Sequence, residues 1–383
     1  MKKLTISLLF LLSLHLLFGQ KQDTIQLETK EEPQGINIGN FVTMSGHWFI
    51  AYRDGYSQTH TDEAHPGLDE HESALVLKRS YFTLKKDIDD IFSVRYTQDI
   101  TIDTEGDDAG NVETRMKYLY LKVKPRIKSK MLTGTWLEVG MVHRPWLDYE
   151  QKINTYRVQD NMAIERNKLF NSADFGVTIG GNIGPKMDKS FLREVNGAMK
   201  GKYFSYSLGV YNGGGYSGAE KNTSKVFATR LSARPFPNKI PELQLSTYFN
   251  LGKGNTEHEP DFNQLMGFVA WTGRNLTLTA QYHTGEGDFK GKYVMPDDKG
   301  KSLKNHGYSF FGEYKFGTSP WAIWGRHDYF SLERELKDDV TRRYIAGLSY
   351  RINKNIRLIL NTEQTEKAGE DDDVYELNLE IVF

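Results

Sequence analysis

Apolar and polar side chains alternate with a period of two residues through most of this chain. The closing segment, 375–383, is the clearest case: five apolar side chains share one face of an extended strand, and Glu376, Asn378 and Glu380 share the other. Successive side chains of a strand point to opposite faces, so the pattern predicts strands with one apolar and one polar face. The same alternation recurs in the segments 92–99, 137–144, 227–234, 276–283 and 356–363.

The polar faces of these predicted strands carry full charges. Arg95 and Asp99 alternate with Phe92, Val94 and Tyr96. Such charges are costly to bury in the core of a soluble protein, whereas a water-filled lumen accepts them while the opposite face meets acyl chains. The alternation therefore predicts an all-β fold, a transmembrane antiparallel β-barrel. Helical periodicity explains none of these segments.

Short and long connections alternate between the predicted strands. The short ones lie at 85–90, 272–275, 316–320 and 353–355. The long ones lie at 54–72, 103–113, 285–305 and 331–339. Membrane barrels have short periplasmic turns and longer external loops, so we assign the two sets to opposite ends of the barrel.

The number of strands depends on one irregular region. The segments 175–184, 193–200 and 203–212 could form three strands, but external loops on both sides leave room for only two. We therefore predict that the pieces before Lys202 form one irregular strand with an insertion. The total becomes about 16, an even number that places both termini in the periplasm.

The chain starts with Met1-Lys2-Lys3 and the mostly apolar run 4–18, a pattern typical of a secretory signal peptide. This run is shorter than the roughly 20 apolar residues that a membrane-spanning helix needs. We predict a signal peptide at residues 1–20 and a short periplasmic segment at residues 21–38, whose polar composition favours disorder. No linker divides the rest, so residues 39–383 are expected to form one outer-membrane β-barrel.

Composition narrows the partners of this barrel. The chain has 13% aromatic residues, no cysteine and a net charge of −1. Lack of cysteine excludes a lipid-anchored lipoprotein and a disulfide framework, and the charge gives no preference for nucleic acid. Aromatic residues near predicted strand ends favour a girdle at the membrane surface over the alternative, a sandwich core. They are Trp48, Tyr52, Phe316, Trp321, Tyr329 and Tyr350.

Three polar clusters are candidates for metal or phosphate chemistry. His60, His65 and His71 lie among acidic residues, 103–108 is an acidic run, and 213–215 is a glycine triplet. Neither of the first two has the ligand spacing of a recognised metal site, and the triplet does not open a helix, as a phosphate cradle requires. We interpret the histidine cluster as a solvated loop, the acidic run as a plain acidic loop and the glycine triplet as a flexible loop, and we predict no metal, no cofactor and no catalytic residue.

Several segments, in their order along the chain, resemble the motifs of one family. They are Lys78–Leu84, Glu138–Trp146, Ile164–Asn167 followed by Asp174–Val177, and Ser207–Gly213. In their order and spacing they are similar to the phosphate-selective porin O and P family, over most of the chain. The resemblance implies a 16-stranded barrel, usually a homotrimer, with a constriction built from loops that fold into the lumen.

The resemblance also implies where the pore narrows. The long connection from Arg144 to Asp174 matches the inward-folded loop and carries Arg157, Arg166 and Lys168. Anion-selective members use basic side chains to replace the solvation shell of a passing anion. The predicted constriction and lumen residues are Arg144, Arg157, Arg166, Lys168, Arg95, Arg230 and Arg326, and Arg115 and Arg357 are further candidates for the wall.

Acidic residues on the predicted inner faces and outer loops would repel anions. Five carboxylates share the predicted inner faces with the arginines, and they are Asp99, Glu138, Glu313, Asp328 and Glu363. The predicted outer loops are acidic as well, at 103–108 and 370–373. Such a mouth would repel phosphate within a Debye length of about 8 Å, so the sequence leaves the preference between anions and cations open.

The predicted function is that of an outer-membrane porin of a Gram-negative bacterium, a passive diffusion channel for small polar solutes, with anions such as phosphate as one candidate class. Expected partners are outer-membrane lipid, lipopolysaccharide, further copies in a homotrimer, and the barrel-assembly machinery, which would recognise the C-terminal strand ending in Phe383. We expect no enzymatic activity. The alternatives are an outer-membrane barrel enzyme of the lipase or protease type and a soluble exported glycan-binding β-protein.

Overall fold

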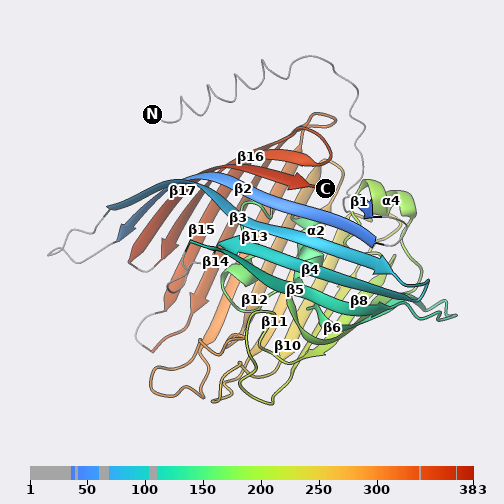
Figure 1. Ribbon diagram of the computed structural model, residues 1–383, viewed down its shortest axis with the longest axis horizontal. Coiled ribbons are helices and arrows are strands. Elements are labelled where there is room, and N and C mark those ends of the chain that lie inside the picture. Colours follow the sequence, from blue (N-terminus) through green and yellow to red (C-terminus); the bar gives the residue numbers. More distant parts are fainter. Residues whose placement is uncertain (1–35, 39–41, 60–68, 103–109, 336–337, 368) are drawn as a thin grey trace.

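Figure 1 shows the computed structural model, which describes residues 36–38, 42–59, 69–102, 110–335, 338–367 and 369–383. The predicted signal peptide and most of the predicted periplasmic segment lie outside these residues. Sixteen strands, β2 to β17, follow one another around a closed antiparallel sheet. The short strand β1 (Ile36–Ile38) pairs with the start of β2.

The barrel strands range from 8 residues in β8 to 19 residues in β3. In chain order they are β2 (Val42–Thr59), β3 (Asp69–Asp87), β4 (Phe92–Ile102), β5 (Val112–Val123), β6 (Leu132–His143), β7 (Ala173–Ile183), β8 (Phe204–Tyr211), β9 (Val226–Ala233), β10 (Leu243–Leu251), β11 (Asn263–Thr272), β12 (Leu276–Glu286), β13 (Lys304–Lys315), β14 (Trp321–Leu332), β15 (Asp339–Arg351), β16 (Ile356–Lys367) and β17 (Glu370–Val382). Each strand pairs with the next, and β17 pairs with β2 to close the barrel. The prediction of about 16 antiparallel strands is confirmed.

Strand β11 shows how the alternation builds the wall. Leu265, Val269 and Trp271 point outward and are 55%, 45% and 37% exposed. Met266 and Phe268 point inward and are buried. Exposed apolar side chains of this kind recur on most strands of the described chain. An apolar surface that encircles a closed sheet fits acyl chains, because in water it would drive association.

The predicted aromatic girdle also lies on the outside of the sheet. Trp48, Tyr52 and Phe316 are exposed outer residues. The ring of Trp321 packs on the ring of Tyr350 across two neighbouring strands, with 4.6 Å between the ring centroids. Outward-facing rings contradict the alternative of a sandwich core and suit the boundary between acyl chains and headgroups.

The seam between the first and last barrel strands depends on a glycine. Phe383 and Gly46 exchange two backbone hydrogen bonds of 2.8 and 3.0 Å. A Cβ atom on Gly46 would lie 2.2 Å from the Phe383 ring, so the ring occupies the space that a side chain at position 46 would need. The ring also meets Trp48 edge-on at 5.1 Å. The C-terminal residue is therefore packed into the closing seam.

Most connections at the two barrel ends differ in length as predicted, and the connection 184–203 at the end that holds Phe383 is the exception. At the end that holds Phe383, four turns span 88–91, 273–275, 316–320 and 352–355. At the opposite end, longer connections include 144–172, 212–225 and 287–303. Two predicted loops are partly strand instead. The hairpin of β2 and β3 continues through 54–59 and 69–72, and β17 begins at Glu370.

Side-chain contacts between β2 and β3 explain why this hairpin extends into the segment predicted to be a loop. The Tyr56 and His71 rings stack at 4.4 Å across the two strands, and His71 contacts the Asp54 carboxylate at 2.5 Å. Cross-strand pairs of this kind stabilise a ladder beyond the membrane. His60, His65 and the acidic run at 103–108 lie outside the described residues.

The prediction for the irregular region is partly wrong. Two strands, β7 and β8, span it as predicted, but residues 193–200 belong to neither. Instead they lie in a connection that contains the short helix α4 (Lys189–Glu194). Gly184, with φ of 90°, and Pro185 end the ladder before this segment, because proline offers no N–H and a positive φ turns the chain out of the sheet.

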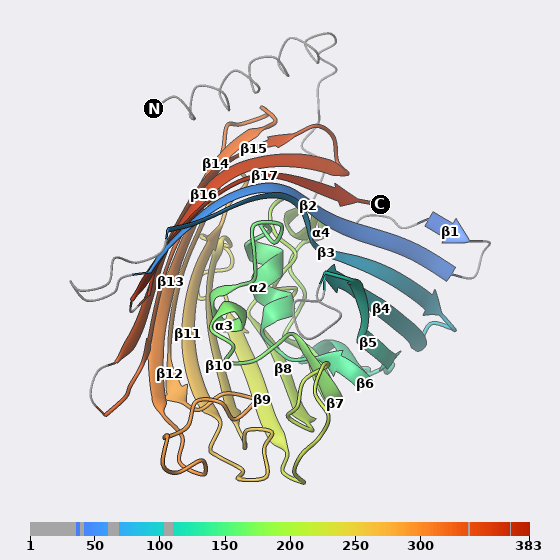
Figure 2. The same cartoon turned by 60° about the vertical axis from the view of Figure 1, so that its left-hand side comes forward.

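The connection between β6 and β7 folds into the barrel. It contains the helices α2 (Leu147–Ile153) and α3 (Ala163–Arg166), and Figure 2 shows both inside the ring of strands. No helix in the described part of the chain is both long and apolar enough to cross a membrane. A buried apolar cluster joins this connection to the wall, and it includes Trp146, Leu147, Phe170, Tyr248 and Phe268. The predicted inward-folded loop is confirmed, and we call residues 144–172 the constriction loop.

Candidate functional site

A buried ion pair fixes the base of the constriction loop. Arg144 donates a hydrogen bond of 2.6 Å to the Asp174 carboxylate, and both side chains are 0% exposed. The backbone N–H of Gly213 donates to the same carboxylate oxygen at 3.2 Å. We predicted that Arg144 lines the pore, but it is enclosed by protein and meets no solvent-filled space. Its position is that of an anchor where the loop leaves the wall.

The first part of the loop packs on strands β9 to β11. The Trp146 ring meets the Phe268 ring edge-on at 5.3 Å. The Arg230 guanidinium lies 4.3 Å from the centre of the Tyr149 ring and donates to the Pro145 carbonyl at 3.0 Å. Arg230 is thus an inner-wall residue as predicted from the alternation, and its bonds hold the loop against the wall.

The middle of the loop crosses to the opposite part of the wall. The Tyr156 ring stacks on Trp324 at 4.5 Å, and its hydroxyl donates to Glu313 at 3.0 Å. Arg357 donates to the Thr155 carbonyl at 2.8 Å and to the Glu380 carboxylate at 2.6 Å. These bonds hold the loop against the β13–β17 side of the wall, whereas the cavity inside the barrel is lined mainly by strands β2 to β8.

Two further predicted residues also hold the loop. Arg326 donates to the Asn161 carbonyl at 2.8 Å and pairs with Asp328 at 2.5 Å. Arg166 contacts Glu363 on β16 and lies 3.3 Å from Asp160.

Asp160 lies among several positively charged side chains in this part of the loop. Burial alone would raise the pKa of Asp160, but the charges of Arg166, Lys78 and Arg79 hold it well below its usual range. Lys168 differs from its neighbours: it is exposed at the end of α3, with φ of 55°.

Three cations converge where the constriction loop meets the wall strands β3 and β5. Arg79 on β3, Lys117 on β5 and Arg157 on the loop all donate to the hydroxyl oxygen of Tyr81. The three distances are 3.2, 3.1 and 3.0 Å. Within the described chain the Nε atom of Arg157 is buried without a hydrogen-bond partner. We call these four residues the Tyr81 cluster.

Reasoning from the sequence found Arg157 but missed Arg79 and Lys117. A β-bulge shifts the pairing of β5 with β4, so Lys117 and Tyr118 both lie on the inner face. A second bulge shifts the pairing of β3 with β2 beside Arg79. A bulge adds one residue and breaks the period of two, so strict alternation could not place Lys117, whereas Arg79 lies two residues before Tyr81 and keeps the period. The motif Lys78–Leu84 was the available signal.

Below the cluster, a cavity of about 940 Å³ opens toward the periplasmic end. Ten basic side chains line it, and they are Lys85, Arg95, Lys117, Lys122, Lys124, Lys152, Arg157, Lys186, Lys200 and Arg230. Three acidic side chains line it, and they are Asp87, Glu138 and Asp148. The predicted lumen residue Arg95 lies 4.8 Å from the centre of the Tyr118 ring. We call this space the periplasmic vestibule.

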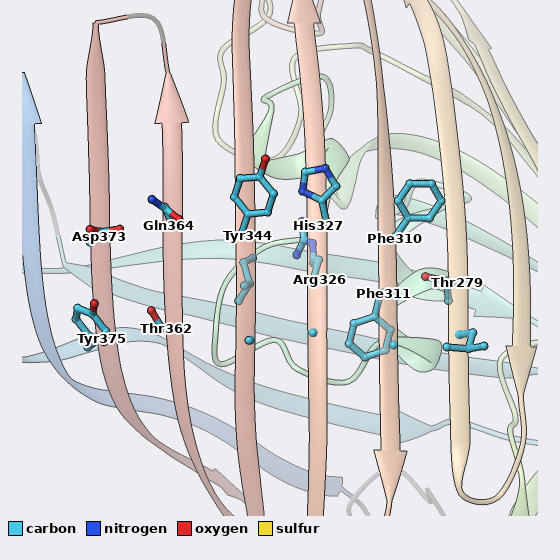
Figure 3. Close-up of a pocket in the computed structure, with 15 residues that line it drawn as sticks. Thr279, Phe310, Phe311, Arg326, His327, Tyr344, Thr362, Gln364, Asp373 and Tyr375 are labelled. Atoms are coloured by element: carbon cyan, nitrogen blue, oxygen red, sulfur yellow. The ribbon is translucent and has the colours of Figure 1, made fainter. Parts of the chain in front are cut away.

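A second depression, of about 850 Å³, lies elsewhere on the barrel. Figure 3 shows side chains that line it, with Phe310, His327 and Tyr344 on neighbouring strands β13, β14 and β15. Gly312, Gly325 and Ala346 are also part of its lining. Phe310 and Tyr344 are exposed outer-face residues, so this groove faces the lipid side and is separate from the path through the lumen.

Comparisons with known proteins identify the architecture. No family model matches the chain, and no curated protein matches it. Among solved structures, the anion-selective porin from Comamonas acidovorans superimposes with a TM-score of 0.57 at 12% identity, covering 89% of this chain and 99% of that one. Salmonella typhi OmpF gives 0.56 at 10% identity, with 89% and 97% covered. Vibrio cholerae OmpT gives 0.55 at 9% identity, with 91% and 100% covered. At these identities the likeness shows a shared fold, the 16-stranded barrel of porins.

Proposed function

We propose that this protein is a porin of the Gram-negative outer membrane, a passive channel for small polar solutes that prefers anions. The observation that carries the proposal is the Tyr81 cluster, where three cations meet at one hydroxyl oxygen and two of them, Lys117 and Arg157, line the cavity inside the barrel. Charged side chains that line a narrow pore set its ion preference. Phosphate belongs to the favoured class, as the resemblance to the phosphate-selective porins suggests.

The carboxylates that oppose an anion path are engaged with the protein itself. Asp99 pairs with Arg115 at 3.4 Å, and Glu138 pairs with Lys122 at 2.9 Å. The remaining three carboxylates of the predicted wall accept hydrogen bonds in the contacts given above: Glu313 from Tyr156, Asp328 from Arg326 and Glu363 from Arg166. Their charges are largely compensated, and two of the five, Glu313 and Glu363, bind the constriction loop directly.

The basic side chains of the vestibule extend the positive electrostatic potential toward the periplasm. Ten basic and three acidic residues line it, so basic side chains outnumber acidic ones by seven. Low-dielectric walls focus the field of such charges into the enclosed water. An anion that passes the Tyr81 cluster therefore enters a region where it remains favoured.

The assembly and export of the protein follow from the same proposal. One of the structures with the same fold is the in-vitro folded OmpT of Vibrio cholerae in its trimer form, with a TM-score of 0.52. We propose a homotrimer here too, surrounded by outer-membrane lipid and lipopolysaccharide. Residues 1–20 would be removed during export, and the barrel-assembly machinery would recognise β17 with its terminal Phe383.

Planar-bilayer recording in a KCl gradient tests this function. The wild-type protein should show conductance steps and a reversal potential that reports chloride preference over potassium. Arg157→Gln should lower the chloride-to-potassium permeability ratio by roughly two- to threefold, because one of three clustered charges is lost. Arg126→Gln is the matched control, since Arg126 is 73% exposed on a periplasmic turn away from the cluster.

Two outcomes count against the proposal. A wild-type protein without conductance would favour an outer-membrane barrel enzyme of the lipase or protease type, which a hydrolase assay on the same preparation would then examine. Cation preference in the wild type, or an unchanged ratio in Arg157→Gln, would remove the Tyr81 cluster from the selectivity site. A soluble exported glycan-binding protein would extract without detergent, which the outward apolar side chains oppose.

A further inference from the structure

The external connection between β8 and β9 contains the glycine triplet 213–215 and is held at two points. At the base of the constriction loop, the Gly213 N–H donates to the Asp174 carboxylate at 3.2 Å. Beyond the triplet, the side-chain amide of Asn255, from the β10–β11 connection, donates to the Ala219 carbonyl at 2.8 Å. The tip of the connection therefore lies between two anchors.

This tip, residues 214–218, lies directly against the constriction loop. A Cβ atom on Gly215 would lie 2.4 Å from the side-chain nitrogen of Asn171, so the close approach requires glycine. Gly215 also has a φ of 76°, which other residues adopt only at a cost. Gly215 and Gly218 stand on either side of Tyr216, so the tip can turn at little conformational cost.

Tyr216 reaches from the tip to the inner wall at β4 and β5. Its hydroxyl donates to the Asp99 carboxylate of β4 at 3.3 Å. The centre of its ring lies 5.9 Å from the Arg115 guanidinium and 5.3 Å from the Lys117 ammonium, both of β5. Asp99 and Arg115 lie near the external ends of their strands, so the ring is on the external side of Lys117.

Two tyrosine rings contact the Lys117 ammonium. It lies 4.7 Å from the centre of the Tyr81 ring and 5.3 Å from that of Tyr216, and Lys117 is only 3% exposed. Cation–π contacts of this kind stabilise a charge that has lost part of its water. Lys117 lines the vestibule, whereas Tyr216 does not. Tyr216 therefore covers the Tyr81 cluster on the side away from the vestibule.

We propose that Tyr216 is a specificity-determining lid of the channel, whose ring limits by size which external anions reach the Tyr81 cluster. The inference rests on the proposed anion-preferring channel and concerns its entrance. A compact anion passes when the tip turns at its glycines. A bulky organic anion needs the whole ring to move away, which breaks the bond to Asp99 and the contact with Lys117. Pore width and pore-lining groups together set the selectivity of a channel.

Anion permeabilities test the lid. Reversal potentials are measured with chloride on the periplasmic side and gluconate on the external side. Tyr216→Ala should raise the gluconate-to-chloride permeability ratio by about threefold or more, because the ring no longer narrows the entrance. Tyr216→Phe keeps the ring and should stay within about a factor of 1.5 of wild type. Tyr293→Ala is the matched control and should leave the ratio unchanged, since Tyr293 is another partly buried loop tyrosine packed against the same apolar cluster.

Cysteine accessibility tests the side from which Tyr216 acts. The chain has no cysteine, so Lys117→Cys offers a single target for a negatively charged thiosulfonate reagent. When Tyr216→Ala is added, modification from the external side should become about fivefold faster or more, because the rate depends on access to the thiol. Modification from the periplasmic side should keep its rate, since Lys117 already lines the vestibule.

The outcomes separate the lid from the channel. An unchanged permeability ratio in Tyr216→Ala, or an equal rise in Tyr293→Ala, overturns the lid and leaves the effect of Arg157→Gln on the reversal potential intact. Faster modification from both sides also overturns it, because a loosened barrel would then explain the result. A ratio in Tyr216→Phe as high as in Tyr216→Ala would deny the ring its role. Cation preference in the wild type defeats the channel proposal itself.

Discussion

Arg144 and Asp174 are joined at 2.6 Å across the two strands from which the constriction loop departs, and neither side chain is exposed. The Arg144 guanidinium also lies 5.5 Å from the centre of the Tyr211 ring and 5.8 Å from that of Phe262. These contacts hold the two ends of the constriction loop together at the wall. From the sequence we predicted that Arg144 lines the pore, whereas in the structure it is buried and paired with Asp174 at the base of the loop.

Replacing Arg144 should destabilise the barrel. Arg144→Met leaves the Asp174 carboxylate buried without its cation, which costs about 3 to 5 kcal/mol. The free energy of unfolding in urea, from detergent micelles, should fall by that amount. The double variant Arg144→Met with Asp174→Leu removes both charges and should recover most of the loss. Equal stability of the single and double variants would show that the pair contributes nothing specific.

The barrel could be predicted from the sequence because its cause is local. In β17, Leu377 and Leu379 face outward while Glu376, Asn378 and Glu380 face inward, as the alternation indicates. Each strand has one face toward the acyl chains and one face toward the lumen, so the alternation of apolar and polar residues recurs in every segment. The same logic placed the short turns and the inward loop. It failed at the bulge beside Lys117 and at residues 193–200, where the ladder is interrupted.

The candidate site could be predicted only in part, because its partners depend on the path of the loop. Arg326 and Arg166 are inner residues, as predicted, yet they bind Asn161 and Glu363 and so fix the loop. The Tyr81 cluster combines residues from three separate segments. Periodicity gives the face of each strand, but not which distant side chains meet across the lumen.

A charge on the outer face should be far more costly than one in the vestibule. Leu379 faces outward on β17, so Leu379→Arg should cost about 2 to 4 kcal/mol near the bilayer midplane. Ser93 lines the vestibule, and Ser93→Arg should cost less than about 1 kcal/mol because water reaches the new charge. The two variants can be compared by the fraction of protein that stays folded after heating, measured by gel electrophoresis. Equal losses would contradict the membrane-facing assignment.

Asn378 is unsuitable as the inner control that the alternation alone suggests. Its side chain is fully buried and donates to Asn361 at 2.7 Å and to Glu376 at 3.3 Å. A new charge there would break this network, so tolerance at the inner face is expected only where the lumen is open to water.

Glu150 should make the constriction loop sensitive to pH. It lies on α2, is 6% exposed and accepts a hydrogen bond of 2.7 Å from the Trp146 indole. Burial raises the pKa of Glu150 from 4.5 to about 7, although the charge of Arg326 acts in the opposite direction. The folded loop therefore favours the protonated acid. This contribution is complete below pH 4.5 and is lost as the pH rises through about 7.

The expected consequence is a loop that is held less firmly at alkaline pH. The difference between 4.5 and about 7 corresponds to roughly 3 kcal/mol of loop docking at most. In the wild type, the noise of the open-channel current should be higher at pH 8 than at pH 5. In Glu150→Gln the noise should be as low at pH 8 as at pH 5, because the amide cannot ionise. Glu165→Gln is the control, since this partly buried carboxylate lies on the same loop. Noise that rises equally in Glu150→Gln would assign the pH dependence to another group.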